Sequence, residues 1–148
     1  VEHRIETVRI LEYVTYINDS KGTNVDSTIK AVRTMDRPTV IILGGYDKHT
    51  SFGPLAEEIV KSPMIRKAVL IGETAPQIRA SLEKAGFTEI TGAGSLREAV
   101  EVSRKLAEKD GCVLMSPACA SFDMFRDYEE RGRAFKNIVN SLEAEDNE

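Results

Sequence analysis

Short apolar runs alternate along this chain with longer segments whose apolar residues recur every three or four positions. The runs occupy residues 39–43, 67–71, 87–90 and 112–115, and a stretch rich in β-branched and aromatic residues covers residues 4–17. Runs of this length and composition are typical of strands, and near-continuous ones of strands covered on both faces. Residues 4–17 predict one bent strand or a pair of short ones.

The segments that follow these runs have the spacing of amphipathic helices. The apolar positions of the five predicted helices are Val25, Ile29 and Val32; Leu55, Ile59 and Val60; Ile78 and Leu82; Leu96, Val100 and Leu106; and Phe125, Tyr128, Phe135, Val139 and Leu142. Strands alternating with helices predict an α/β fold. We expect a Rossmann-like, doubly wound, mainly parallel sheet of about six strands flanked by helices.

Polar residues and glycines mark the ends of several predicted helices. Asn24 or Asp26 can cap the first helix, Ser95 can cap the fourth, and Gly86 follows the third. Gly132 takes an apolar position in the last helix, where glycine costs about 1 kcal/mol relative to alanine. We therefore expect Gly132 to let another backbone pack closely.

Composition favours a soluble protein with one domain over residues 1–148. The chain is 41% hydrophobic and 30% charged, and no apolar run approaches the roughly 18 residues of a membrane helix. It begins at Val1 in a strand-like pattern, which suggests a domain of a longer protein, and residues 143–148 form an acidic end expected to fray.

Charge and cysteine content narrow the classes of partner. The net charge of −4 and the absence of a dense lysine and arginine cluster argue against nucleic acid or a membrane as partner. Cys112 and Cys119 have neither disulfide-framework nor zinc-site spacing, so a reduced, cytoplasmic protein is expected. His3 and His49 are too few and too isolated to indicate a metal site.

Three polar loops follow predicted strands, at residues 18–24 (NDSKGTN), 44–51 (GGYDKHTS) and 116–123 (SPACASFD). In a doubly wound sheet the carboxyl ends of the strands share one edge, where ligands bind. Lys21 and Lys48 supply charges there, Thr23 and Ser121 supply hydroxyls, and at least one helix N-terminus would supply backbone donors. This set suits a small ligand with two carboxylates.

Nucleotide-binding fingerprints are missing from the chain. It has no G-x-x-x-x-G-K-[ST] sequence, and Gly44-Gly45 lacks the spacing of a dinucleotide site. Alone, the domain is not expected to hold a nucleotide tightly. Two further interpretations stay open. One is a stand-alone α/β binding or receiver-like signalling module in which Asp19 and Lys48 form an acidic pocket, for which the sequence offers only Asp19 and Asp47 as acidic residues. The other is a purely structural role for residues 116–132.

Four motifs together resemble a known family. His3-Arg4, NDSKGTN, GGYDK and the sequence SPACASFDMFRDYEERGRAF at residues 116–135 are similar to the C-terminal domain of the Mur ligases, in particular of the members that add D-glutamate. The resemblance covers the whole chain in order. It implies an ATP- and Mg²⁺-dependent ligase in which the alanyl carboxylate of UDP-N-acetylmuramoyl-L-alanine becomes an acyl phosphate and the amine of D-glutamate attacks it.

The resemblance also implies roles for particular residues. D-glutamate would be bound by Lys21, Thr23, Lys48, Ser121 and the backbone at Phe122 and Tyr128. Arg4 would reach the phosphates of ATP and Asp19 its ribose. The family's P-loop and magnesium ligands belong to a central domain that is absent here, so no metal site is expected in this chain. The isolated chain is expected to be an inactive monomer.

Overall fold

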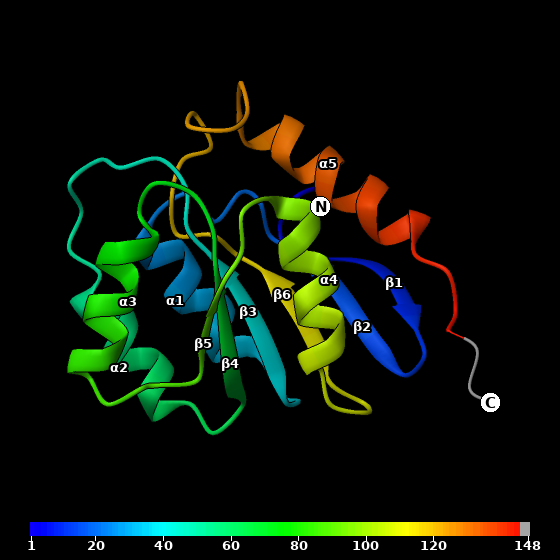
Figure 1. Ribbon diagram of the computed structural model, residues 1–148, viewed down its shortest axis with the longest axis horizontal. Helices are drawn as coiled ribbons and strands as arrows, with labels where there is room; N and C mark the ends of the chain where they lie inside the picture. The colour runs from blue at the N-terminus through cyan, green and yellow to red at the C-terminus, as the bar shows by residue number, and fades with distance from the viewer. Residues whose placement is uncertain (146–148) are drawn as a thin grey trace.

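One six-stranded sheet runs through the molecule in the order β1-β2-β6-β3-β4-β5 (Figure 1). In this computed structural model, which describes residues 1–145, the strands are β1 (Glu6–Leu11), β2 (Val14–Asn18), β3 (Thr39–Leu43), β4 (Ile65–Leu70), β5 (Ile90–Gly92) and β6 (Cys112–Met115). β1 is antiparallel to β2, and all other neighbours are parallel. The predicted α/β fold with a mainly parallel sheet is confirmed.

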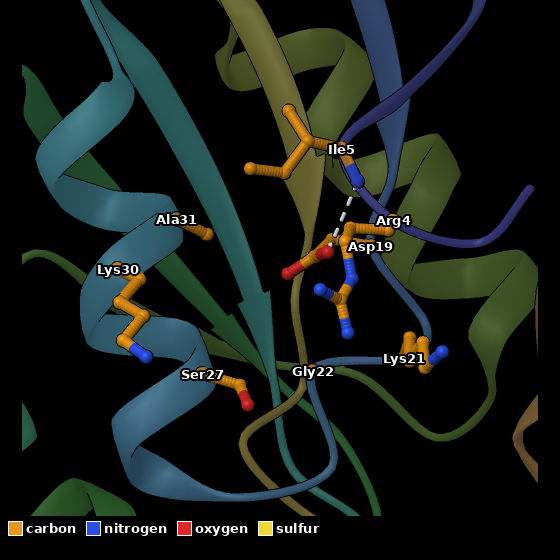
Figure 2. A pocket seen from close by; sticks show the side chains of 8 residues that line it. All are labelled: Arg4, Ile5, Asp19, Lys21, Gly22, Ser27, Lys30 and Ala31. Carbon is orange, nitrogen blue, oxygen red and sulfur yellow. Dashed lines mark hydrogen bonds between the residues drawn. The ribbon is translucent and has the colours of Figure 1, made fainter. Parts of the chain in front are cut away.

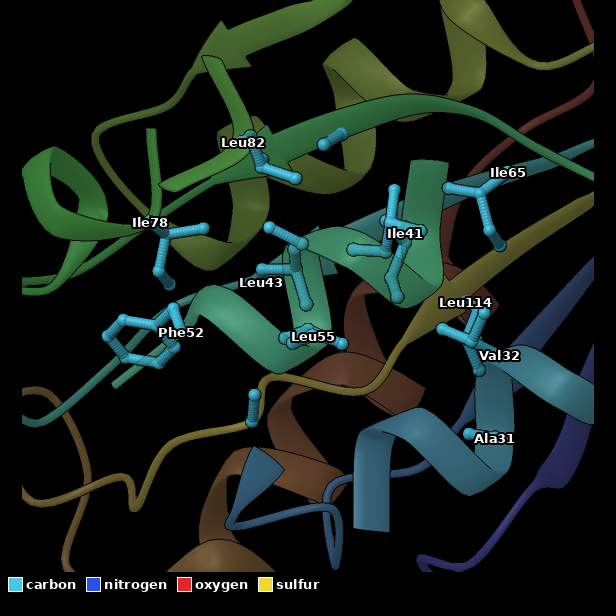
Figure 3. Packing of buried hydrophobic residues seen from close by; sticks show 14 of the residues in the cluster. Ala31, Val32, Ile41, Leu43, Phe52, Leu55, Ile65, Ile78, Leu82 and Leu114 are labelled. Atoms are coloured by element: carbon cyan, nitrogen blue, oxygen red, sulfur yellow. The ribbon is translucent and has the colours of Figure 1, made fainter. Parts of the chain in front are cut away.

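Within residues 1–145, five helices cover the two faces of this sheet (Figure 1). They are α1 (Val25–Thr34), α2 (Gly53–Lys61), α3 (Ala75–Lys84), α4 (Leu96–Leu106) and α5 (Tyr128–Ser141). The first three pack on one face, against Ile41, Leu43 and Leu114 (Figure 3). α4 and α5 pack on the other face, against Ile42 and Val113. Because successive strand residues point to opposite faces, a strand buried on both faces reads as an uninterrupted apolar run.

Residues 4–17 form a pair of short strands rather than one bent strand. β1 and β2 are joined by Glu12 and Tyr13, whose φ angles are 52° and 68°. Positive φ at both central residues is characteristic of the two-residue hairpin turn whose twist matches that of the strands. Neither residue favours this conformation strongly, which is why the sequence pattern did not locate the turn.

The fifth strand and the last helix begin later in the chain than predicted. β5 covers Ile90–Gly92 instead of residues 87–90, because Ile90 pairs with Ala68 of β4. α5 begins at Tyr128, where Asp127 caps it by accepting a hydrogen bond from the Glu130 N–H at 2.8 Å. The sequence analysis placed Phe125 in this helix, and that part of the prediction is wrong.

Residues 121–125 form a separate turn before α5. The carbonyl of Ser121 accepts hydrogen bonds from the N–H groups of Met124 and Phe125 at 3.0 and 2.8 Å. Phe125 packs against the apolar cluster beneath α4 and α5 from this turn. Because the half-buried Phe125 lies three residues before Tyr128, it extended the helical spacing of apolar residues in the sequence, although it lies outside the helix.

Gly132 does make room for a close neighbour, but the neighbour is a side chain. A Cβ at Gly132 would overlap the Nδ1 edge of the His3 imidazole ring. His3 is 4% exposed, and its Nδ1 lies 2.9 Å from the Asn18 amide nitrogen. The prediction of a packed backbone at Gly132 is therefore wrong, whereas the close approach itself is observed.

The described part of the acidic end, residues 143–145, contacts the β1–β2 hairpin and Arg104. Arg104 donates a hydrogen bond to the Glu143 carbonyl at 2.6 Å and also pairs with Glu12. The Glu145 N–H donates to the Glu12 carboxylate at 3.2 Å. Residues 146–148 lie outside the described part, so fraying of the tail stays a prediction. Within residues 1–145, every helix is too short or too polar to cross a bilayer.

Candidate functional site

The three predicted loops leave neighbouring strands at the same edge of the sheet. β2, β6 and β3 are adjacent and parallel, and we call the segments that follow them the β2 loop (residues 19–24), the β6 loop (residues 116–127) and the β3 loop (residues 44–52). The β6 loop leads to α5 on one face, and the other two lead to α1 and α2 on the opposite face. In α/β sheets, ligands bind where the connections diverge in this way, and we call the region between the three loops the crevice.

The β2 and β6 loops are joined by backbone and side-chain hydrogen bonds. The Ser116 hydroxyl donates to the Asp19 carboxylate at 2.6 Å, and the Ala118 N–H donates to the Gly22 carbonyl at 2.9 Å. Thr28, in the first turns of α1, donates to the Ser116 carbonyl at 3.2 Å. These bonds place Thr23, which is half-buried, directly beside the β6 loop.

The β3 and β6 loops are also in direct contact. The Gly44 N–H donates to the Pro117 carbonyl and the Tyr46 N–H to the Ala120 carbonyl, each at 2.9 Å. The rings of Tyr46 and Phe122 meet edge to face, with centroids 5.7 Å apart. The loop that carries Lys48 therefore lies against the loop that carries Ser121, as the sequence analysis anticipated.

The predicted ligand-binding side chains differ in their surroundings. Lys48 and Lys21 are exposed, and among residues 1–145 the Lys48 amine has no ion-pair or hydrogen-bond partner. Ser121 is 1% exposed, and its hydroxyl has no partner within the same residues. A buried hydroxyl without a partner costs free energy that a ligand oxygen could recover. Phe122 is 61% exposed at the outer side of this contact.

Tyr128 stands apart from the other predicted contacts. Its backbone carbonyl accepts a hydrogen bond from the Ser20 hydroxyl at 2.6 Å, and its ring meets the His3 ring edge to face at 6.0 Å. Tyr128 is the first residue of α5, where backbone N–H groups lack helical partners. Of its backbone groups, the N–H is therefore the one that could donate to a ligand.

A pocket of about 300 Å³ lies on the α1 side of the β2 loop (Figure 2). Its walls combine three cations with one carboxylate and one hydroxyl, and the lining residues are Arg4, Ile5, Asp19, Lys21, Gly22, Ser27, Lys30 and Ala31. In Figure 2 the Arg4 and Asp19 side chains lie together across from those of α1. Such a donor set is suited to phosphate oxygens beside a hydroxyl-bearing group.

Asp19 is held rigidly at the wall of this pocket. It is 4% exposed; one carboxylate oxygen accepts from the Ile5 N–H at 3.0 Å and the other from the Ser116 hydroxyl at 2.6 Å. Burial raises the pKa of Asp19 above its ordinary value of 3.8, against the lowering effect of these two hydrogen bonds. The carboxylate is thus fixed in orientation between Arg4 and the β6 loop.

Arg131 is a buried cation at this edge that the sequence analysis missed. It is fully buried in α5, and its guanidinium donates to the Ser20 hydroxyl at 2.9 Å, the Ser20 carbonyl at 2.7 Å and the Cys119 carbonyl at 2.9 Å. Burial lowers the pKa of Arg131 to about 10. It fastens the β2 loop to the β6 loop. Its position four residues before Phe135, on the buried stripe of the helix, was the available signal.

The acidic pocket of a receiver-like module is not formed. Asp19 belongs to the β2 loop and Asp47 to the β3 loop, and β6 separates the two strands. The Asp47 carboxylate accepts hydrogen bonds from the His49 N–H at 2.7 Å and the Gln77 amide at 3.2 Å. Among the described residues, no three His, Cys, Asp or Glu side chains are grouped to hold a metal ion.

The family follows from the sequence match together with this architecture. Residues 3–119 match the sequence model described as "Mur ligase, glutamate ligase domain", and the chain belongs to this family. The UDP-N-acetylmuramoylalanine–D-glutamate ligase of Clostridioides difficile is 46% identical over 142 residues, which are 96% of this chain and 31% of the relative. The ligase of the same description from Thermoanaerobacter sp. (strain X514) is 48% identical over 146 residues, with the same coverage. The chain thus spans about a third of the length of these curated relatives.

Solved structures share the fold at low sequence identity. The UDP-N-acetylmuramate-alanine ligase of Thermotoga maritima superimposes with a TM-score of 0.64 at 16% identity, over 95% of this chain and 30% of that one. A domain from a putative UDP-N-acetylmuramate:L-alanyl-gamma-D-glutamyl-medo-diaminopimelate ligase of Haemophilus ducreyi gives 0.55 at 16% identity, over 94% and 96% of the two chains. The MurF ligase of Thermotoga maritima in complex with ADP gives 0.55 at 11% identity, over 95% of this chain and 32% of that one.

Proposed function

We propose that this chain is the amino-acid-binding, closing domain of an ATP-dependent ligase that joins D-glutamate to UDP-N-acetylmuramoyl-L-alanine in peptidoglycan precursor synthesis. The names of relatives that are 46 and 48% identical support the reaction. The observation that carries the domain's role is the contact between the β3 and β6 loops. Tyr46 of the β3 loop meets Ala120 and Phe122 of the β6 loop, and this supports a site shared by Lys48 of one loop and the unpartnered Ser121 hydroxyl of the other.

D-glutamate carries two carboxylates and one amine, and the crevice offers groups that match the carboxylates. The exposed Lys48 amine is a point charge that can follow a carboxylate at the rim. Ser121 supplies a hydroxyl with no protein partner, and Thr23 supplies a second hydroxyl from the β2 loop. Lys21 adds positive charge beside Thr23. Together these groups would hold the amino acid by its acidic ends and leave its amine free for reaction.

The pocket beside Asp19 fits part of a nucleotide. Arg4 can meet phosphate oxygens, and the fixed Asp19 carboxylate can accept hydrogen bonds from ribose hydroxyls. ATP would supply the activation of the alanyl carboxylate, while Arg4 and Asp19 would orient its sugar and phosphates. The described residues offer no group of ligands for Mg²⁺, so its ligands are expected elsewhere in the protein.

Steady-state kinetics of the full-length protein test this function. In Lys48→Ala, we expect the KM for D-glutamate to rise about 10- to 100-fold, because a charge-assisted hydrogen bond contributes roughly 1.5 to 3 kcal/mol. Ser121→Ala should raise it about 3- to 10-fold, as expected for one neutral hydrogen bond. Lys61→Ala, an exposed lysine on α2, is the matched control and should leave it unchanged.

The outcomes separate this function from its rivals. No D-glutamate-dependent ligation by the wild-type protein would contradict the reaction. Ligation with wild-type KM in both variants would contradict the role of the crevice and favour residues 116–132 as packing only. Saturable Mg²⁺ binding by the isolated domain would favour a signalling module. That the protein is monomeric and cytoplasmic, and that it binds neither nucleic acid nor membrane, stays a prediction.

A further inference from the structure

The β3 loop has little regular structure, although it carries Lys48. Residues 46 to 51 are mostly exposed and belong to no helix or strand. The amine of Lys48 has no partner within residues 1–145. Its placement must therefore be set by the backbone on either side of Lys48. The hydrogen bonds of Gly45 and Asp47 show what holds that backbone.

Both residues are bonded to one short turn between β4 and α3, residues 72–74. The Gly45 N–H donates to the Thr74 hydroxyl at 3.0 Å, and the Thr74 N–H donates back to the Gly45 carbonyl at 3.2 Å. The Asp47 N–H donates to the Glu73 carboxylate at 2.7 Å. Gln77, one turn into α3, donates to the Asp47 side chain at 3.2 Å. The β3 loop is thus fastened on both sides of Tyr46.

The same turn is bonded to the β6 loop. The Glu73 N–H donates to the Asp123 carboxylate at 3.2 Å, and the Thr74 hydroxyl lies 3.4 Å from the Cys119 sulfur. Gly72 has a φ of 73°, and a Cβ there would lie 2.5 Å from the Asp123 carboxylate and 2.8 Å from the Gly45 Cα. The turn therefore fits closely between the two loops and allows no side chain at Gly72.

We infer that the 72–74 turn is a positioning element that sets Lys48 over Ser121, with Glu73 as its main contact to the lysine's loop. Glu73 is exposed and holds a backbone N–H one residue from Lys48. It acts through the backbone of Asp47 and not on the ligand. This role deepens the proposed function and rests on it, because the lysine that Glu73 positions is the one assigned to D-glutamate.

A positioning role for Glu73 predicts a change in the KM for D-glutamate without loss of the fold, whereas a merely structural role does not. Loss of the Glu73 carboxylate frees one backbone bond in an exposed loop, so the fold should survive while the Lys48 amine becomes less well placed. The KM for D-glutamate should then rise about two- to tenfold, the effect of one net hydrogen bond, with kcat and the KM for ATP nearly unchanged. Glu73→Gln retains an acceptor oxygen and should restore most of the affinity.

The experiment compares Glu73→Ala with Glu73→Gln in the full-length protein by two measurements. The first is D-glutamate kinetics. The second is deuterium uptake of the peptide covering residues 44–52, which does not depend on any substrate. Glu73→Ala should raise this uptake and Glu73→Gln should not. Glu83→Ala, an exposed glutamate at the other end of α3, is the matched control for both.

Each result either supports or overturns the inference. Increased uptake together with an increased KM in Glu73→Ala, and neither change in Glu73→Gln, supports it. Unchanged uptake overturns it, since the Asp47 bond would then not hold the loop. Increased uptake with a wild-type KM also overturns it, because the loop's position would not matter to the ligand. A wild-type protein that does not use D-glutamate at all identifies the proposed function as the failure, whatever the uptake of residues 44–52.

Gly72→Ala provides an independent check of the same geometry. The new methyl group would displace the Gly45 backbone, and the positive φ of Gly72 itself already disfavours a side chain. We expect a KM increase for D-glutamate at least as large as that of Glu73→Ala. A folded Gly72→Ala protein with the wild-type KM would contradict the close fit between the turn and the two loops.

Discussion

Gly132→Ala tests the packing at the centre of α5, because two physical effects of opposite sign compete there. Alanine in a helix interior is favoured over glycine by about 1 kcal/mol, so helix propensity alone predicts a more stable protein. The added methyl group would, however, overlap the Nδ1 edge of the His3 ring. His3 is 4% exposed and is bonded to Asn18, so it has little room to move.

The structure indicates which effect is larger. Overpacking a close-packed site costs about 1 to 3 kcal/mol, and loss of the buried bond between His3 and Asn18 adds about 1 kcal/mol. After subtraction of the helix gain, Gly132→Ala should lower the free energy of unfolding by about 1 to 3 kcal/mol. Because the His3 carbonyl accepts the Lys21 N–H at 2.9 Å, the displacement should also disturb Arg4 and the pocket next to it.

Urea unfolding of four proteins measures this competition: wild type, Gly132→Ala, His3→Ala and the double variant. In the His3→Ala background the ring is gone, so Gly132→Ala should become neutral or stabilising by about 1 kcal/mol. The predicted coupling between the two sites is therefore at least about 1 kcal/mol. A stabilised Gly132→Ala single variant, or additive effects of the two substitutions, would refute the reasoning.

Two further substitutions test the electrostatics of the site. Burial raises the pKa of Asp19, so folding favours its protonated form. The stability that results is present below the pKa of Asp19 in the unfolded chain, and it is lost as the pH rises through the pKa in the folded protein. Asp19→Asn should therefore be more stable than wild type at pH 7. Urea unfolding should show this gain shrinking as the pH approaches 3.8, and a gain that grows at low pH would contradict the prediction. Arg131→Lys should lose about 2 to 4 kcal/mol, since an ammonium group has all its donors on one nitrogen and cannot span the acceptors on Ser20 and Cys119 that three guanidinium nitrogens reach. A loss no greater than that of the exposed Arg133→Lys would show that the guanidinium does not fasten the loops.

The sequence pattern was sufficient for most strands and helices because their burial is regular. Residues 39–43 and 112–115 are buried on both faces, and such runs can hardly be read otherwise. The pattern of apolar residues failed where a residue outside any helix or strand packs on the core. Phe125 packs on the core from a turn and extended the apparent helix, and the start of β5 is set by pairing with β4, which no local pattern records.

The candidate site was predictable in part for a similar reason. Each polar loop could be assigned to the carboxyl end of a strand, since parallel strands all end at one edge. That the β6 loop lies between the β2 and β3 loops depends on strand order, which periodicity does not contain. The arginine that joins two of these loops was hidden because a charged residue at position 131 reads as a solvent-facing one.

A crystal structure of the full-length protein with D-glutamate would test most directly whether the β3 and β6 loops build one binding site. We predict that the Lys48 amine and the Ser121 hydroxyl both lie within hydrogen-bond distance of carboxylate oxygens on the same D-glutamate molecule. A ligand bound away from these loops, or one that contacts only one of the two side chains, would contradict the shared site.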